Sequence, residues 1–113
     1  MAFGGRGSIV LETTSAYGLK FLVPAHDSGV GLSLRENGEF ARVEVDLIKE
    51  LSAGGALIDV GANIGSIALP AASAARLVIA LEANRGFANV LAANTLNNSL
   101  FNVSVVHAAV GET

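Results

Sequence analysis

From residue 56 onward, short apolar runs alternate with helix-like stretches, and this alternation restricts the fold more than any other feature. The apolar runs are ALIDV at 56–60, LVIALE at 77–82 and one within NVSVVHAAV at 102–110. The segments between them, 65–75 and 86–97, have helical character. Continuous apolar runs indicate strands of a parallel sheet that helices cover on both faces. The sequence therefore predicts an α/β protein, the β-α-β-α-β first half of a doubly wound fold.

The first part of the chain is β-rich instead. Apolar runs at Ile9–Thr13 and Leu19–Val23 flank a turn-like SAYG at 15–18. We expect a hairpin with one buried face, because apolar and polar residues alternate in the second run. Pro24 ends the hairpin, and AHDSGVG continues as a loop.

A lead-in helix is predicted over residues 40–52. Val43, Leu47, Ile48 and Leu51 recur at helical spacing, and charged residues fill other positions. The glycines at 54 and 55 end this helix, since glycine adopts the left-handed conformation readily. Within 65–75, Pro70 removes a backbone donor, so we expect that helix to start late or to bend, with Ser66 as its cap.

Composition restricts the class of protein. The 113 residues are enough to form the hydrophobic core of one domain. Of these residues 51% are hydrophobic, and there is no cysteine. The net charge is −3 and lysines and arginines do not cluster, which argues against a nucleic-acid partner. The sequence indicates neither a signal peptide nor a membrane span, so we expect a cytoplasmic protein without a membrane partner. No metal site is predicted.

The segment LIDVGANIGSIAL at 57–69 carries the chemistry. In an α/β sheet, ligands bind beyond the carboxyl ends of the strands, where Asp59 would lie. Gly61 permits a tight turn, Asn63 tolerates unusual backbone angles, and Gly65 allows a close approach of helix or ligand. A turn of this kind also occurs for packing alone, with Asp59 as a simple cap. The sequence leaves both interpretations open at this point.

Glu82 strengthens the functional interpretation. It ends the next apolar run, 23 residues after Asp59, where a carboxylate can accept both ribose hydroxyls of an adenosine-like ligand. A dinucleotide is the weaker candidate, because Asn63 replaces the middle glycine of the G-x-G-x-x-G fingerprint. The ammonium and carboxylate of an amino-acid tail fit better, with Asp59 facing the ammonium and backbone N–H groups holding the carboxylate.

These segments resemble a known family. LIDVGANIGSIAL, VIALEAN, NVSVVHAAVGE and the upstream GEFARVEVDLIKELSAGGALIDVG are similar to the FkbM family of S-adenosylmethionine-dependent methyltransferases, over residues 37–113. Ala83 departs from the proline that the family usually has there. The resemblance implies an incomplete Rossmann-like class I methyltransferase fold: strands 1 to 3 of a sheet ordered 3-2-1-4-5-7-6, after the hairpin and the lead-in helix. It divides the chain into an N-terminal hairpin and loop (1–36) and a partial cofactor domain (37–113).

The resemblance also implies site residues. The methionine part of S-adenosyl-L-methionine would be held by the loop Asp59–Gly65, which includes Gly61, Ala62 and Asn63. The ribose would be held by Glu82. Ala83 and Asn84 would flank the adenine, with Ala108, between His107 and Ala109, near its edge.

No catalytic base is predicted. His107 and His26 are expected to be ordinary exposed residues, and Glu36, Glu39 and Glu44 a solvated face, with Glu44 a minor candidate for reaching the cofactor.

The implied activity is methyl transfer to a hydroxyl of a small metabolite or sugar, with this chain as the cofactor-binding half, inactive alone. The alternatives are a dinucleotide-dependent oxidoreductase fragment and a non-catalytic module that folds as an oligomer. Strand 56–60 would lack its neighbour, strand 4. We therefore expect self-association through this edge, or cover by the hairpin.

Overall fold

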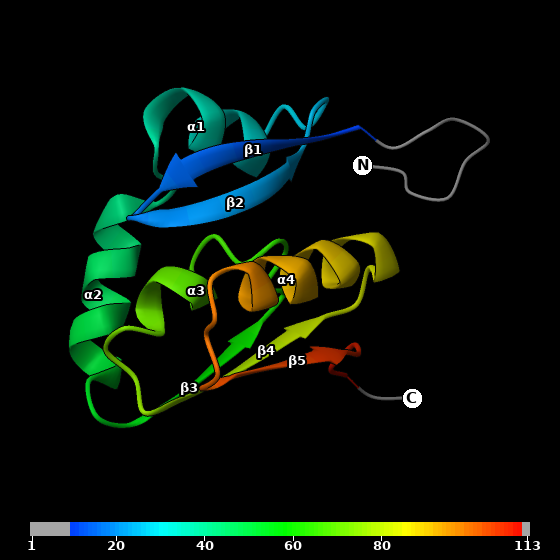
Figure 1. Cartoon of the computed structure of the whole chain (residues 1–113). Coiled ribbons are helices and arrows are strands. Elements are labelled where there is room, and N and C mark those ends of the chain that lie inside the picture. The colour runs from blue at the N-terminus through cyan, green and yellow to red at the C-terminus, as the bar shows by residue number, and fades with distance from the viewer. Residues whose placement is uncertain (1–9, 112–113) are drawn as a thin grey trace.

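The computed structural model describes residues 10–111, and its parallel sheet confirms the predicted α/β fold (Figure 1). The sheet has the order β3-β4-β5, which is the order 3-2-1 expected for the first three strands. Strands β1 and β2 form a separate antiparallel pair. In chain order the elements are β1 (Leu11–Ala16), β2 (Leu19–Pro24), α1 (Val30–Asn37), α2 (Arg42–Ser52), β3 (Ala56–Val60), α3 (Ala68–Ala71), β4 (Leu77–Glu82), α4 (Arg85–Asn97) and β5 (Val103–His107).

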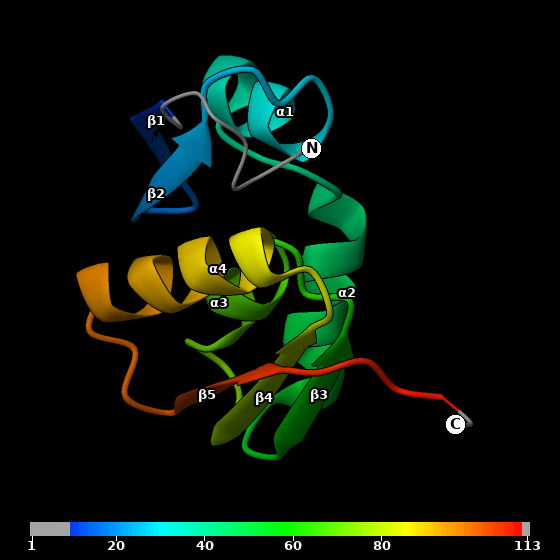
Figure 2. The ribbon, with the colours of Figure 1, turned by 90° about the vertical axis from the view of Figure 1, so that its right-hand side faces the viewer.

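The elements stack in layers. Figure 2 shows α3 and α4 over one face of the sheet, with the hairpin and α1 beyond α4. No element of residues 10–111 covers the other face, where the residues Ile58 and Val60 are 62% and 60% exposed. The expectation that helices cover both faces of the sheet is therefore wrong for these residues. A continuous apolar run indicates that its side chains favour burial, but it does not indicate whether helices of the same segment cover both faces.

The hairpin is confirmed, and its turn explains its register. Tyr17 and Gly18 have positive φ angles of 54° and 74°, as in the type I′ turns whose twist matches paired strands. Phe21 and Val23 are fully buried on one face. Ile9, the expected first residue of the hairpin, lies outside the described residues.

A helix, α1, occupies part of the segment that the sequence analysis assigns to a loop. Its N-cap is Gly29, and the carboxylate of Asp27 supports the first turn by accepting the N–H groups of Gly29 at 3.3 Å and Gly31 at 2.8 Å. Gly31 has no room for a side chain, since an added Cβ would lie 2.6 Å from Val23. The helix ends at Gly38, which has a φ of 68°. The loop prediction is therefore wrong from Val30 onward, because Asp27 and Gly38, which hold the two ends of the helix, give only a weak signal in the sequence.

Helix α2 forms where it is predicted, but three of the four residues in its predicted apolar stripe face outward, and the fourth, Ile48, is half-buried. Val43, Leu47 and Leu51 are 77%, 53% and 77% exposed, whereas Val45 and Ser52 are buried. The spacing correctly indicated a helix, yet it did not identify which face packs against the protein.

Helix α3 is much shorter than the predicted segment 65–75. It begins at Ala68, so the expected late start is confirmed. Pro70 is its third residue, where a missing N–H breaks no helical hydrogen bond. Ser66 makes no capping hydrogen bond to this helix.

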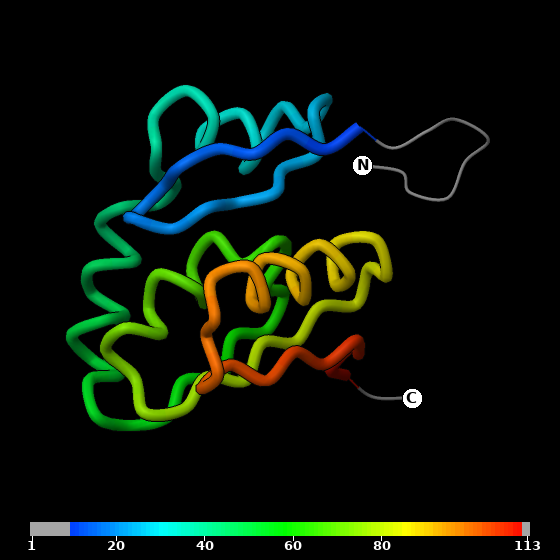
Figure 3. Tube along the Cα trace, in the orientation of Figure 1, coloured from blue at the N-terminus to red at the C-terminus, as the bar shows by residue number. Residues whose placement is uncertain are grey.

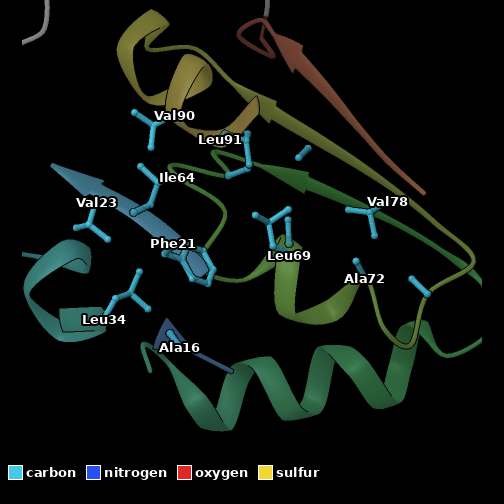
Figure 4. Close-up of a cluster of buried hydrophobic side chains, with 14 residues drawn as sticks. Ala16, Phe21, Val23, Leu34, Ile64, Leu69, Ala72, Val78, Val90 and Leu91 are labelled. Carbon is cyan, nitrogen blue, oxygen red and sulfur yellow. The ribbon is translucent and has the colours of Figure 1, made fainter. Parts of the chain in front are cut away.

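One hydrophobic cluster joins the hairpin to the parallel sheet. Figure 4 shows Phe21 and Val23 of β2 and Leu34 of α1 in the same cluster as Ile64 and Leu91. The division of the chain at residues 36 and 37 stays a prediction.

Strand β3 is an edge of the parallel sheet, and within residues 10–111 the hairpin pairs with none of its strands. Figure 3 traces the hairpin on the far side of α4 from the sheet. The prediction that the hairpin covers this edge is therefore wrong, and self-association stays a prediction.

No helix among the described residues is long and apolar enough to span a membrane.

Candidate functional site

The carboxyl ends of β3 and β4 bring together Asp59, the following loop and Glu82. Strands β3 and β4 pair in parallel, with Asp59 opposite Ala80. Glu82 lies two residues beyond Ala80 and therefore faces the same side of the sheet as Asp59, the side that α3 and α4 cover. The sequence correctly predicted that these two acids share one edge.

The loop 61–65 is folded by residues with positive φ angles. Gly61, Asn63 and Gly65 have φ of 79°, 56° and 101°, a region that glycine adopts without strain and asparagine tolerates. Gly65 is also tightly packed, because an added Cβ would lie 2.6 Å from Leu69 and 3.0 Å from Leu91. Gly61 has open space around it, so only its backbone angle favours glycine.

Every N–H group of this loop already has an acceptor within the protein. Those of Gly61 and Ala62 both donate to the Leu81 carbonyl at 2.9 Å. Asn63 N–H donates to Glu82 at 2.8 Å, and Ile64 N–H to the Asn63 side chain at 2.9 Å. Gly65 N–H donates to the Ala62 carbonyl at 2.9 Å. The expectation that these groups hold a ligand carboxylate is therefore not met in this conformation.

Glu82 joins the two strand ends. Its Oε1 accepts the N–H of Asn63 and its Oε2 accepts the N–H of Asn84, at 2.8 and 2.7 Å. The residue is 8% exposed, so these backbone donors compensate the burial of its charge. A carboxylate has about four acceptor positions, and two of those of Glu82 receive no hydrogen bond from the described residues.

Asp59 differs from Glu82 in its surroundings. Burial raises the pKa of Asp59 above its ordinary value, and the nearby charge of Glu82 raises it further. Both effects disfavour the ionised carboxylate. A cation placed near the two acids would offset the repulsion between them and favour the ionised form of Asp59.

The residues after β4 and β5 complete the edge. Asn84 caps α4, because its Oδ1 accepts the N–H of Phe87 at 3.0 Å. Ala108 N–H donates to the Glu82 carbonyl at 3.1 Å.

His107 is exposed and lies opposite Glu82 in the sheet, and its Nε2 is 2.9 Å from the Ala83 carbonyl. Ala83 and Asn84 are both exposed. The expected adenine-side residues thus lie around Glu82.

The remaining candidates lie on other elements. Glu44 is exposed in the first turn of α2, and Glu36 is exposed in α1. Glu39 pairs with Arg42 at 3.5 Å, and His26 is exposed. Residues 10–111 contain no group of three or more His, Asp or Glu side chains that could hold a metal.

Sequence reasoning missed Asn94 of α4, which is fully buried and donates to the Ile64 carbonyl of the loop at 3.0 Å. Its only signal was an amide on the helix face that carries Val90 and Leu91.

Solved structures share this fold. Trm5 of Methanocaldococcus jannaschii, solved with adenosine, has a TM-score of 0.72 and 18% identity, over 95% of this chain and 32% of that one. TYW2 of M. jannaschii, solved with AdoMet, has a TM-score of 0.68 and 23% identity, over 90% and 45%. A complex of aTrm5 with tRNALeu has a TM-score of 0.70 and 16% identity, over 90% and 29%.

This chain therefore has the Rossmann-like fold of S-adenosylmethionine-dependent methyltransferases, as expected, and spans less than half the length of each of these proteins. The cofactor expected from the sequence is the one bound in TYW2. No protein-family model matches the sequence, and no curated protein matches it.

The expected partners are contradicted. A small-molecule acceptor and the exclusion of nucleic acid disagree with structural neighbours that include a tRNA m1G37 methyltransferase and the tRNALeu complex. The exclusion rested on a net charge of −3 and on the scattered basic residues of these 113 residues. The charge of a chain that covers 29% of a tRNA-bound protein says nothing about the surface of the rest.

Proposed function

We propose that this chain binds S-adenosyl-L-methionine at the carboxyl ends of β3 and β4 and serves as the cofactor-binding part of a methyltransferase. One observation carries the proposal. Two carboxylates, Asp59 and Glu82, meet at a loop whose five N–H groups already donate within the protein. Such a site attracts cations and hydroxyl donors, and it offers little to an anion.

S-adenosyl-L-methionine matches this chemistry. It carries a positive sulfonium, a positive ammonium and two ribose hydroxyls, which suit carboxylate acceptors, and its single carboxylate would lie away from the two acids. A dinucleotide would instead place a pyrophosphate here, where free N–H groups are needed and two carboxylates repel it. The electrostatics therefore favour the methyl donor over the oxidoreductase alternative.

The proposed roles follow from the positions of the residues. Glu82 accepts the ribose hydroxyls with the acceptor positions that Asn63 and Asn84 leave free. Asp59 faces the ammonium. The loop residues Gly61, Ala62, Asn63 and Gly65 shape the space for the methionine part. Ala83 and Asn84 flank the adenine, and Ala108 lies near its edge.

The structural neighbours support this proposal, since two of them were solved with AdoMet or adenosine. Membership of the FkbM family stays a prediction from the sequence motifs, and so does a cytoplasmic location. The proposal concerns cofactor binding, because the chain covers 29% to 45% of the neighbours described above and methyl transfer needs the whole protein.

Thermal unfolding with three ligands tests the proposal. At 100 times its dissociation constant, a ligand stabilises the folded state by about 2.7 kcal/mol, which corresponds to a Tm increase of roughly 10–20 °C for a chain of this size. We expect this increase with S-adenosylmethionine and S-adenosylhomocysteine and none with NAD. An increase with NAD alone would favour the oxidoreductase fragment. No increase with any ligand, in a folded sample, would favour the non-catalytic module.

The ribose assignment is best tested on the ligand, because Glu82 also holds the loop backbone. A 2′,3′-dideoxy analogue of S-adenosylhomocysteine removes both hydroxyls and leaves the protein intact. We expect its affinity to fall at least tenfold. Equal affinity for the two ligands would refute the assignment of the ribose to Glu82.

A further inference from the structure

Asn94 connects three parts of the molecule through one buried amide. Its side chain is fully buried in α4, which lies between the hairpin and the sheet (Figure 2). Its Oδ1 accepts the N–H of Leu22 at 2.6 Å, and its Nδ2 donates to the Leu22 carbonyl at 3.2 Å. The same Nδ2 donates to the Ile64 carbonyl at 3.0 Å. Asn94 thus pairs with β2 of the hairpin as a strand would, and it also holds the loop.

The bond to Ile64 fixes one peptide unit of the loop at both ends. The carbonyl oxygen of the unit accepts from Asn94, and its N–H, which belongs to Gly65, donates to the Ala62 carbonyl at 2.9 Å. The Ile64 side chain is fully buried in the cluster that includes Val23 of the hairpin (Figure 4). The path of the loop is therefore fixed partly by α4, through Asn94, and partly by the packing of Ile64 against the hairpin.

We propose that Asn94 is a positioning residue for the cofactor loop and that it couples cofactor binding to the docking of the hairpin on α4. This inference rests on the proposed function, since it assigns Asn94 to the same site. Because the hairpin and the loop share one amide, a ligand that orders the loop also strengthens the hairpin contact, and docking of the hairpin strengthens ligand binding by the same factor.

Asn98 provides a matched control one helical turn further on. Its Oδ1 accepts the N–H of Lys20 and its Nδ2 donates to the Lys20 carbonyl, both at 2.9 Å. It repeats the pairing of Asn94 with β2, and its Nδ2 makes its other bond to the Asn94 carbonyl at 2.8 Å, not to the loop. The two positions share the pairing with β2 and differ in the contact with Ile64 and in burial, since Asn94 is fully buried and Asn98 is half-buried.

Calorimetric titration with S-adenosylhomocysteine tests the inference on the wild type, Asn94→Ala and Asn98→Ala, each well below its own Tm. We expect Asn94→Ala to weaken binding at least tenfold and Asn98→Ala less than threefold. Equal effects of the two variants, or none from Asn94→Ala, would overturn the role of Asn94. Failure of the wild type to bind would overturn the proposed function instead.

Amide hydrogen exchange on the wild type keeps the test decisive if Asn94→Ala does not fold. Saturation with S-adenosylhomocysteine should slow exchange of the Leu22 N–H at least threefold more than that of the Lys20 N–H. A ligand that binds and leaves Leu22 unchanged, or slows both amides equally, would contradict the coupling.

Discussion

The carboxylate of Glu82 holds the backbone of Asn63: its Oε1 accepts that N–H at 2.8 Å, while its Oε2 accepts the N–H of Asn84 at 2.7 Å. One acid thereby fixes the loop after β3 and the start of α4. Its role begins before any ligand arrives, since both bonds are intramolecular.

Glu82→Gln tests this structural role. Glutamine offers one acceptor oxygen, so one of the two N–H groups would face an amide NH₂ and lose its partner. We expect the free energy of unfolding, measured by urea denaturation without ligand, to fall by about 1–3 kcal/mol. Glu36→Gln, at an exposed position, should change it by less than about 0.5 kcal/mol. If the two variants behave alike, Glu82 does not hold the loop.

Asp59→Asn should stabilise the unligated protein and weaken cofactor binding. Burial and the charge of Glu82 raise the pKa of Asp59 in the folded state. The ionised form therefore opposes folding, and stability is lost as the pH rises from the unfolded value, about 3.9, through the raised pKa. Asparagine removes this loss at pH 7 and makes little difference at pH 3, where the acid is protonated in both states.

Urea denaturation at the two pH values, with S-adenosylhomocysteine titration at pH 7, measures both effects. Asp59→Asn should have the higher free energy of unfolding at pH 7 and at least about tenfold weaker binding, which is 1.4 kcal/mol. A variant that is less stable at pH 7 and binds as well as the wild type would contradict this account of Asp59.

Two glycines of the loop should respond differently to alanine. Gly61→Ala meets only an unfavourable φ of 79°, which costs roughly 1–2 kcal/mol. Gly65→Ala meets a φ of 101° and a Cβ placed 2.6 Å from Leu69, which adds about 1–3 kcal/mol of overpacking. Chemical denaturation should rank Gly65→Ala as the less stable of the two. The opposite ranking would mean that the helix after the loop does not approach as described.

The inward face of α2 can be checked by a similar pair. Val45 is fully buried and Leu47 is 53% exposed. Val45→Ala removes two buried methyl groups and should cost about 2 kcal/mol of unfolding free energy. Leu47→Ser should cost less than about 0.5 kcal/mol beyond the small helix-propensity difference. A larger loss at Leu47 would restore the sequence-based view that its stripe packs against the protein.

The strands of the fold were predictable because their signals are local. ALIDV and LVIALE are short, mainly apolar segments, each with one acid at or near its end, and the turn at Tyr17 and Gly18 matches a short hairpin connection. The orientation of α2 was not predictable, because periodicity defines a stripe and only tertiary contacts decide whether it is buried. The outward position of Val43 follows from how α2 packs, through Val45 and Ser52.

The site likewise has features that local sequence signals predict and features that depend on tertiary contacts. Asp59 and Glu82 could be placed at one edge because parallel strands end together. The occupied N–H groups of the loop could not be anticipated, since the acceptors for Gly61 and Asn63 come from β4, about 20 residues away in sequence. Asn94 lies farther still, 30 residues from its partner Ile64.

The most direct test of the central claim is a titration of the ¹⁵N-labelled protein with S-adenosylhomocysteine, followed residue by residue in amide NMR spectra. Our account predicts saturable shifts of the Gly61, Asn63, Asn84 and Ala108 amides, which lie around Asp59 and Glu82, and unchanged amides in the outer turns of α2. A well-dispersed spectrum in which those four amides stay in place at millimolar ligand would show that this edge of the sheet is not a cofactor site.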